Sequence, residues 1–422
     1  MNRFLLIPTF ILILGCTNQK GEKNHADLIQ SGNSFYTIDF PTILENKREI
    51  QISEIANNIE YILLESKGES VLGRIHDAAF TKDYIFISAF GTPLLAQFDQ
   101  KGNFIRFVGK IGRGPEEYDL VRQFSIDEES ELIYIQPNWT RNILVYSFDG
   151  KYVKTIKLNR DDRSIVWDRD NIFMCYSEPS IGNEKYVFTE TSSYGDTLQT
   201  VTNYCLWKDP PPFGRMRGYP GQRFFYRMNN RLHFKGMYND TVYTYNDDYK
   251  IIPKLSINLG KFKLPEEMIF ERGLVRRIPT DYYWVAVNES SSYVFMYYCA
   301  YDTDDSQGPG HGALNAGHMI YDKKSGLGTA LKNNEGKMIL FNIIGKWGFK
   351  NDIDGGPELI PEYTNDSTSF HFISSISMKK YLASDEFKNS TPKDQNKKKK
   401  LMDQMSGLKE SDNDILMVVR LK

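Results

Sequence analysis

Short apolar runs separated by Gly, Asp, Asn or Pro dominate the chain from about residue 35 onward. Each run is rich in β-branched and aromatic residues, which is typical of β-strands. The periodicity of an amphipathic helix is nearly absent through the first 250 residues. The clearest predicted strands are 59–64, 84–88, 94–98, 104–108, 132–135, 143–148 and 153–158.

A weak internal repeat joins these runs into hairpins. Each copy has an aromatic strand, an Asp/Gly turn and a second strand. The copies lie at 95–105, 145–153, 242–249 and 319–326, and the segment 188–201 fills the gap between the second and third of them. A period of about 45 to 50 residues is typical of a propeller blade built from four short strands. The repeat therefore predicts an all-β propeller of about six to seven blades.

The last part of the chain departs from this pattern. We predict a short C-terminal helix around 377–387, followed by the lysine run 397–400. We interpret that run as a solvated helix face or loop rather than a docking patch for anionic lipid. The final strand, 415–421, is apolar enough to need partners on both faces. Pairing it with the N-terminal strands would close the ring and cover exposed sheet edges.

Composition supports an all-β chain and argues against nucleic acid as a partner. Of the 422 residues, 14% are aromatic, with 26 Tyr and 26 Phe against only 4 Cys. The formal net charge of −2 gives no basic face for nucleic acid. Beyond Cys16 the cysteines are Cys175, Cys205 and Cys299, whose pairing stays open and whose spacing does not predict a zinc site.

The N-terminus carries a targeting signal. The apolar run 4–15 directly precedes Cys16 and is too short for the roughly 20 residues of a bilayer span. It resembles a bacterial lipoprotein signal, which implies a signal peptide at 1–15, lipid on the cysteine and a membrane as partner. The alternative is an ordinary cleaved signal peptide with an incidental cysteine. The polar segment 16–34 is then a flexible tether, and 35–422 is the propeller.

A more specific likeness is carried by the segment 98–118, which includes Gly112-Arg113-Gly114-Pro115. It resembles an NHL-like propeller blade and, more narrowly, the six-bladed β-propeller lipoproteins that are abundant in some Gram-negative anaerobes. The segments 321–326 and 351–357 and the short terminal strand match the same family. The resemblance implies six blades and little chemistry, because the ligands and activities of this family are largely unassigned. Glu116 departs from it, since the family often has Gly there.

Two loops hold candidate ligand-binding residues. The glycine-rich loop 109–118 is suited to cradling phosphate through its backbone N–H groups, but it lacks the Lys-Ser/Thr of a nucleotide loop. A structural turn between blades is the alternative. The irregular segment 302–318 is suited to lining a pocket or ligating a metal, and a solvated insertion is its alternative. The candidates in the two loops are Arg113, Glu116, Asp302, Asp304, His311 and His318.

The candidate metal ligands are Asp352 and Asp354. They alternate on a glycine-rich loop, and carboxylate oxygens are the donors that Ca²⁺ prefers. The alternative is a network of Asx turns that fixes the loop through side-chain to backbone hydrogen bonds. No catalytic motif based on a serine nucleophile or on HExxH is present in the sequence.

Two function hypotheses follow. In the first, the protein is a membrane-anchored binding or scaffold lipoprotein of the cell envelope, with a protein, small molecule or glycan as ligand. In the second, it resembles the Ca²⁺-dependent six-bladed lactonases, as a hydrolase-like or lyase-like enzyme with an ion over the central channel. The sequence favours the first. Because an acidic run is missing after Cys16, we expect an outer-membrane protein that faces the periplasm, with surface exposure as the alternative.

Overall fold

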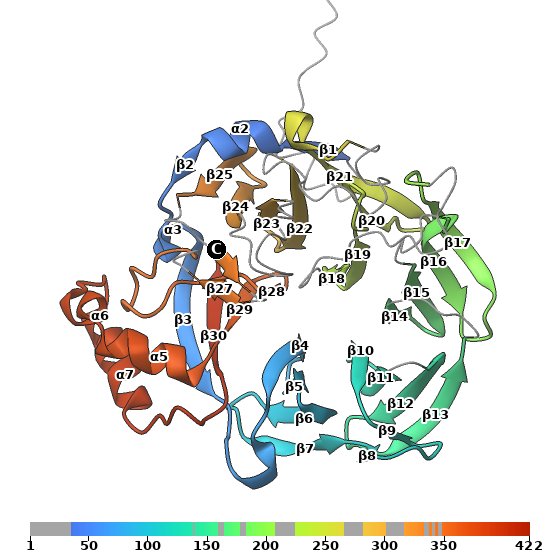
Figure 1. Ribbon diagram of the computed structural model, residues 1–422, viewed down its shortest axis with the longest axis horizontal. Helices are drawn as coiled ribbons and strands as arrows, with labels where there is room; N and C mark the ends of the chain where they lie inside the picture. The colour runs from blue at the N-terminus through green and yellow to red at the C-terminus, as the bar shows by residue number, and fades with distance from the viewer. Residues whose placement is uncertain are drawn as a thin grey trace, which may run out of the picture.

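The computed structural model describes residues 35–137, 140–158, 164–177, 183–206, 224–265, 282–300, 316–332, 337–339, 342–344 and 348–422, with only the backbone at 337–339 and 342–344. Six sheets of four or five strands surround a central axis (Figure 1). This arrangement confirms the predicted six-bladed β-propeller.

In each of the first five blades the chain starts at the axis and adds strands outward (Figure 1). Blade one comprises β4 (Arg74–Phe80), β5 (Tyr84–Phe90), β6 (Thr92–Asp99) and β7 (Phe104–Val108). Blade two comprises β10 (Val121–Asp127), β11 (Leu132–Pro137), β12 (Asn142–Ser147) and β13 (Tyr152–Lys157). Blade three comprises β14 (Ser164–Arg169), β15 (Ile172–Tyr176), β16 (Tyr186–Ser192) and β17 (Thr197–Thr202).

Blades four and five each carry a fifth, outermost strand from the N-terminal segment. Blade four comprises β18 (Phe225–Met228), β19 (Arg231–Phe234), β20 (Thr241–Tyr245), β21 (Ile251–Asn258) and the parallel strand β1 (Tyr36–Asp39). Blade five comprises β22 (Tyr283–Glu289), β23 (Tyr293–Ala300), β24 (Ala316–Asp322), β25 (Leu327–Leu331) and the parallel strand β2 (Lys47–Arg48). Two small pairs lie outside the blades: β8 (Lys110–Ile111) with β9 (Glu117–Tyr118), and β26 (Lys337–Ile339) with β27 (Asn342–Ile344).

Blade six joins the two ends of the chain. Its strands are β28 (Tyr363–Thr364), β29 (Thr368–Ile373), β30 (Ile415–Leu421) and β3 (Ala56–Leu63). β30 pairs antiparallel with both β29 and β3, and its residues 415–417 are fully buried. The prediction of a ring-closing terminal strand is therefore confirmed. An apolar strand with hydrogen-bonded neighbours on both sides leaves no edge there for another chain to pair with.

The five repeat copies are the third and fourth strands of blades one to five, with the hairpin turn between them. The sixth blade has no copy, because its third and fourth strands, β30 and β3, come from opposite ends of the chain. The repeat thus correctly located the five blades whose third and fourth strands are consecutive in the sequence.

Helices flank the ring at both ends of the chain. The N-terminal segment contains α2 (Phe40–Glu45), α3 (Ile52–Ile55) and the 3₁₀ turn η1 (Gly68–Ser70), which the strand pattern did not predict. Between β29 and β30 lie α5 (Ser375–Ala383), α6 (Asp385–Asn389) and α7 (Gln395–Met405). The single helix predicted at 377–387 is divided at Ser384, whose side chain caps α6 by accepting from the N–H of Phe387.

The lysine run lies on α7, and the interpretation of it as a solvated face is wrong for one member. Lys398 is buried, and its ammonium donates to the carbonyls of Phe387 (2.7 Å) and Ser390 (2.8 Å). These are carbonyls at the C-terminal end of α6, where a positive charge is favourable. Lys399 and Lys400 are exposed, as expected.

We predict that Gly102→Ala weakens the contact between blade one and blade six. Gly102 has φ +86°, and an added Cβ would lie 2.2 Å from the Leu63 carbonyl oxygen of β3. Gly91 has φ +81° with open space around it, so Gly91→Ala pays only for the left-handed backbone, about 1–2 kcal/mol. Urea denaturation is expected to show a larger loss of unfolding free energy for Gly102→Ala. Equal losses would contradict this contact.

Candidate functional site

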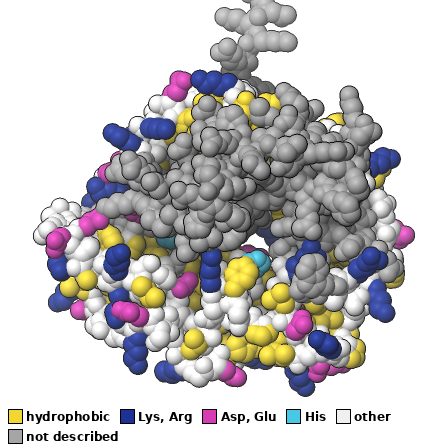
Figure 2. Space-filling view, viewed as in Figure 1, with side chains coloured by type: hydrophobic (Ala, Val, Ile, Leu, Met, Phe, Trp, Pro, Cys, Tyr) yellow, Lys and Arg dark blue, Asp and Glu magenta, His cyan; other side chains and the backbone are white. Residues whose placement is uncertain are grey.

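Strand direction gives the ring two different faces. The hairpin face carries the turns between the third and fourth strands of each continuous blade, at 100–103, 148–151, 193–196, 246–250 and 323–326. The opposite, connection face carries the links from the second to the third strand and from one blade to the next. Figure 2 shows Lys and Arg interspersed with Asp and Glu over the described surface in its view, in keeping with a net charge of −2.

A cavity of about 210 Å³ lies at the connection face, between blades three, four and five. Four segments line most of it: 202–205 at the end of β17, 235–241 between β19 and β20, 257–264 after β21, and 283–285 at the start of β22. Gly236 permits the close approach of one of these segments, since a Cβ there would lie 2.9 Å from Val187 of β16. The cavity therefore exists only where three blades meet.

The walls of the cavity are mainly apolar and aromatic. The lining side chains of this kind include Met237, Tyr238, Ile257, Leu259, Trp284 and Val285. A cavity of about 150 Å³ is enough to hold benzene, so this one has room for a small molecule with a six-membered ring and a polar group. Walls of this kind supply contact area, while a few polar groups fix orientation.

Three charged side chains lie in the cavity lining: Lys235, Asp240 and Lys263. Asp240 pairs with Lys263 at 2.7 Å, which leaves Lys235 without a carboxylate within ion-pair distance among the described residues. The Lys235 side chain is buried, and among the described residues its ammonium has a single hydrogen bond, 3.4 Å long, to the carbonyl of Gly236. Burial lowers the pKa of Lys235 to about 8, opposed by the nearby Asp240 and assisted by Lys263.

The amide side chains of the lining are already used by the protein. Asn203 donates to the carbonyl of Glu184 (2.9 Å) and accepts from the N–H of Cys205 (3.0 Å). Asn239 accepts from the N–H of Thr241 and donates to the hydroxyl of Tyr243. Lys235 differs from these amides, because an ammonium has three donors and this one makes a single long bond within the described part of the chain.

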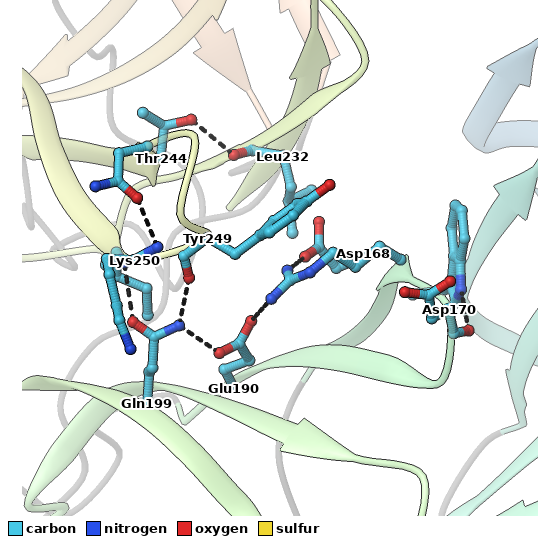
Figure 3. A network of polar contacts seen from close by, with 12 residues as sticks. Asp168, Asp170, Glu190, Gln199, Leu232, Thr244, Tyr249 and Lys250 are labelled. Carbon is cyan, nitrogen blue, oxygen red and sulfur yellow. Dashed lines mark hydrogen bonds and ion pairs between the residues drawn. The ribbon is translucent and has the colours of Figure 1, made fainter. Parts of the chain in front are cut away.

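Charged groups near the hairpin face are paired with one another, by contrast (Figure 3). Arg169 pairs with Asp168 and with Glu190 (2.7 Å), and its guanidinium lies over the rings of Tyr245 and Tyr249. Gln199 donates to Glu190 and to the Tyr249 carbonyl (Figure 3). These contacts tie blade three to blade four, so we interpret them as structural.

A second cluster, centred on the buried carboxylate of Glu289, ties blade four to blade five. Glu289 is fully buried, accepts from the hydroxyl of Tyr226, and pairs with Lys323 at 2.6 Å and with Lys254 at 3.9 Å. Burial alone would raise the pKa of Glu289, but the two ammonium groups hold it at about 2. His233 stacks on the ring of Tyr226 with centroids 5.1 Å apart. Burial lowers the pKa of His233 to about 3, so it is neutral in the fold.

The predicted glycine-rich loop joins blade one to blade two. Arg113 and Glu116 are exposed there, and the Glu116 carbonyl accepts from the hydroxyl of Tyr146. Glu117 folds back to accept from the N–H of Gly114 (3.0 Å). The loop is thus a hydrogen-bonded turn, and the role of its two exposed candidates in ligand binding stays a prediction.

The predicted histidine-rich segment lies largely outside the described residues, and so do Asp302, Asp304 and His311. The fourth candidate, His318, is buried in β24 beside the ring of Tyr297, with centroids 5.2 Å apart. Burial, with a smaller contribution from His371, lowers its pKa to about 3. Cys16 and the tether are also outside the described residues, so lipid attachment stays a prediction.

The two candidate metal ligands have different protein partners. Asp352 accepts from the N–H of Ser53 (2.9 Å) and pairs with Lys393 (2.8 Å). Asp354 is buried and accepts from Asn351 (2.6 Å) and from the N–H of Gly356 (2.8 Å). Within the described part of the chain, no group of three or more His, Cys, Asp or Glu residues is placed to hold a metal ion. A role in Ca²⁺ binding therefore stays a prediction.

The fold and the cavity define a class: a six-bladed β-propeller with a small-molecule-sized cavity on its connection face. Residues 35–420 match the family model "Domain of unknown function (DUF4934)", and the chain belongs to that family. No curated protein matches the sequence. Among the described helices, none combines the length and the hydropathy needed to cross a bilayer.

A solved structure has the same fold. A Bacteroides fragilis NCTC 9343 protein described as a "Putative exported protein" matches with a TM-score of 0.62 and 16% sequence identity, over 92% of this chain and 100% of that chain. A duf4221 family member from Bacteroides vulgatus ATCC 8482 matches with a TM-score of 0.48 and 11% identity, over 89% of this chain and 99% of that chain. The narrower likeness to NHL-like propellers and to lipoproteins stays a prediction.

We predict that the buried histidines make the fold sensitive to acid. The pKa of both His233 and His318 is about 3 in the fold, against about 6.5 in the unfolded chain. Below pH 6.5 the unfolded state binds protons that the folded state does not, so unfolding free energy falls as pH falls towards 3. Between pH 7 and pH 5 each histidine is expected to cost about 2 kcal/mol.

Chemical denaturation at several pH values measures this effect. The difference in unfolding free energy between wild type and His233→Gln, or His318→Gln, is expected to change between pH 7 and pH 5. His76 is exposed on β4, so His76→Gln is the matched control and is expected to leave the pH profile unchanged. A wild-type profile that the two buried-histidine variants reproduce would show the prediction to be wrong.

Proposed function

We propose that this protein is an exported binding protein of the cell envelope, anchored by lipid on Cys16 and holding a small ligand in the cavity at its connection face. The observation that carries the proposal is the cavity of about 210 Å³, with its apolar and aromatic walls and its buried ammonium at Lys235. The description of the Bacteroides fragilis protein as exported supports the location. The domain faces the periplasm in this proposal.

Recognition of a ligand is the role that this geometry supports best. The cavity forms where three blades meet, and the strands behind it hold its walls in place. A site that is formed in advance binds with less ordering of side chains and loops, and so loses less of its binding free energy. The polar groups that fix orientation then come from a few side chains, chiefly Lys235 and the Asp240–Lys263 pair.

The anchor is tested by cell fractionation. We expect wild type in the membrane fraction and Cys16→Ala in the soluble fraction, because a lipoprotein cysteine carries the acyl chains that hold it at the membrane. Incorporation of radiolabelled palmitate into wild type but not into Cys16→Ala provides an independent readout. A Cys16→Ala variant that remains with membranes would overturn the anchor.

The cavity is tested by blocking its mouth. Thr202 lines the cavity and is exposed, so Thr202→Trp is expected to obstruct the space without burying a new group in the core. Thr197 is an exposed threonine at the opposite end of the same strand, β17, and Thr197→Trp is the matched control.

Ligands are sought by thermal shift with a library of sugars, glycan fragments, amino acids and organic acids. A ligand that binds only the native state raises the Tm in proportion to its binding. We expect at least one compound to raise the Tm of wild type and of Thr197→Trp but not of Thr202→Trp. Compounds that stabilise all three proteins equally would place binding elsewhere and overturn the proposed site.

A further inference from the structure

We propose that the ligand of this cavity is a monoanionic carboxylate with an apolar or aromatic body, and that the Lys235 ammonium binds its carboxylate group. This inference rests on the proposed function and names the chemical class of the ligand. It comes from the contrast between Lys235 and four other polar side chains of the lining: Asn203 and Asn239, which are hydrogen-bonded within the protein, and Asp240 and Lys263, which pair with each other.

The position and the few contacts of the Lys235 ammonium favour binding of an anion. Lys235 is 6% exposed, lines the cavity, and, of the hydrogen bonds that the described residues offer, makes one long one, to the Gly236 carbonyl at 3.4 Å. A buried charge without strong partners is unfavourable, and a carboxylate in the cavity would supply both the opposite charge and short hydrogen bonds. Burial of Lys235 therefore favours the bound state.

The charge balance of the lining selects a single negative charge. Among the described residues of the lining, Lys235 and Lys263 contribute two positive charges and Asp240 one negative charge, which gives these residues a net charge of +1. A dianion such as a phosphate monoester would exceed this balance and would approach Asp240 as a like charge. The remaining walls, among them Met237, Leu259 and Trp284, match an apolar or aromatic body.

The effect of the buried Lys235 charge on stability can be measured without any ligand. Burial of the charged form lowers the pKa of Lys235, so the folded protein is less stable at neutral pH than with a neutral side chain there. Lys235→Met keeps most of the length of the side chain and removes the charge. We expect its Tm in the absence of ligand to be at least that of wild type.

The test compares acids with their neutral amides by isothermal titration calorimetry. The probes are three pairs: phenylacetate and phenylacetamide, indole-3-acetate and indole-3-acetamide, and 4-methylpentanoate and 4-methylpentanamide. We expect at least one acid to bind wild type about ten-fold or more tightly than its amide, since a charge-assisted hydrogen bond contributes at least about that factor. Thr202→Trp is expected to abolish binding of that acid.

Variants at two lysines then assign the charge. Lys235→Met is expected to remove the preference for the acid, while Lys261→Met, at an exposed lysine of the nearby 3₁₀ turn η2 (Gly260–Phe262), is expected to keep it. If Lys235→Met does not fold, the preference of wild type for the acid and its loss in Thr202→Trp still decide whether a carboxylate binds in this cavity.

Three outcomes overturn the inference. Equal binding of acid and amide, lost in Thr202→Trp, leaves the proposed function standing and removes the carboxylate from it. A preference that persists in Lys235→Met assigns the charge recognition to another group. Absence of binding by every probe in wild type counts against both the inference and a small-molecule cavity.

Discussion

The pairing of β30 with β29 on one side and with β3 on the other is the interaction on which this ring depends. Leu63 of β3 pairs with Ile415 of β30. The closing contact therefore joins the strand of blade six that comes first in the sequence to the one that comes last. Without it, β28 and β29 would form a two-stranded ribbon with open edges, and blade one would lose part of the blade that it packs against.

The N-terminal segment extends this constraint to the cavity. After residue 35 it adds β1 to blade four, and Ile38 pairs with Ile257, a residue of the cavity wall. Phe40 of α2 then packs edge-on against Phe262, with ring centroids 5.9 Å apart, beside the wall residues Leu259 and Lys263. The segment that would lead from the tether into the propeller therefore also supports the outer wall of the cavity.

Local patterns predicted what is local in this fold. The hairpins of blades one to five follow from aromatic strands and Asp/Gly turns, and the terminal strand follows from its uninterrupted apolar run. The break at Ser384 was missed, because a serine inside a helical pattern and a serine cap look alike until the backbone direction is known. His318 was chosen as a ligand by residue type, whereas its burial beside Tyr297 is decided by a neighbouring strand. The cavity could not be predicted, since its lining comes from four segments that only the ring brings together.

The position of Lys235 in the fold differs from the position that its sequence context suggests. A single lysine follows the strand β19 and the buried Phe234, and from sequence alone it would be placed at a solvated strand end. In the fold it is buried with little to bind, while Arg169, Glu289 and Lys398 are surrounded by partners that neutralise or cap them. Natural proteins satisfy nearly all of their buried polar groups, and exceptions concentrate at functional sites. The Lys235 ammonium, with one long hydrogen bond among the described residues, is thus the structural reason to place ligand recognition in this cavity.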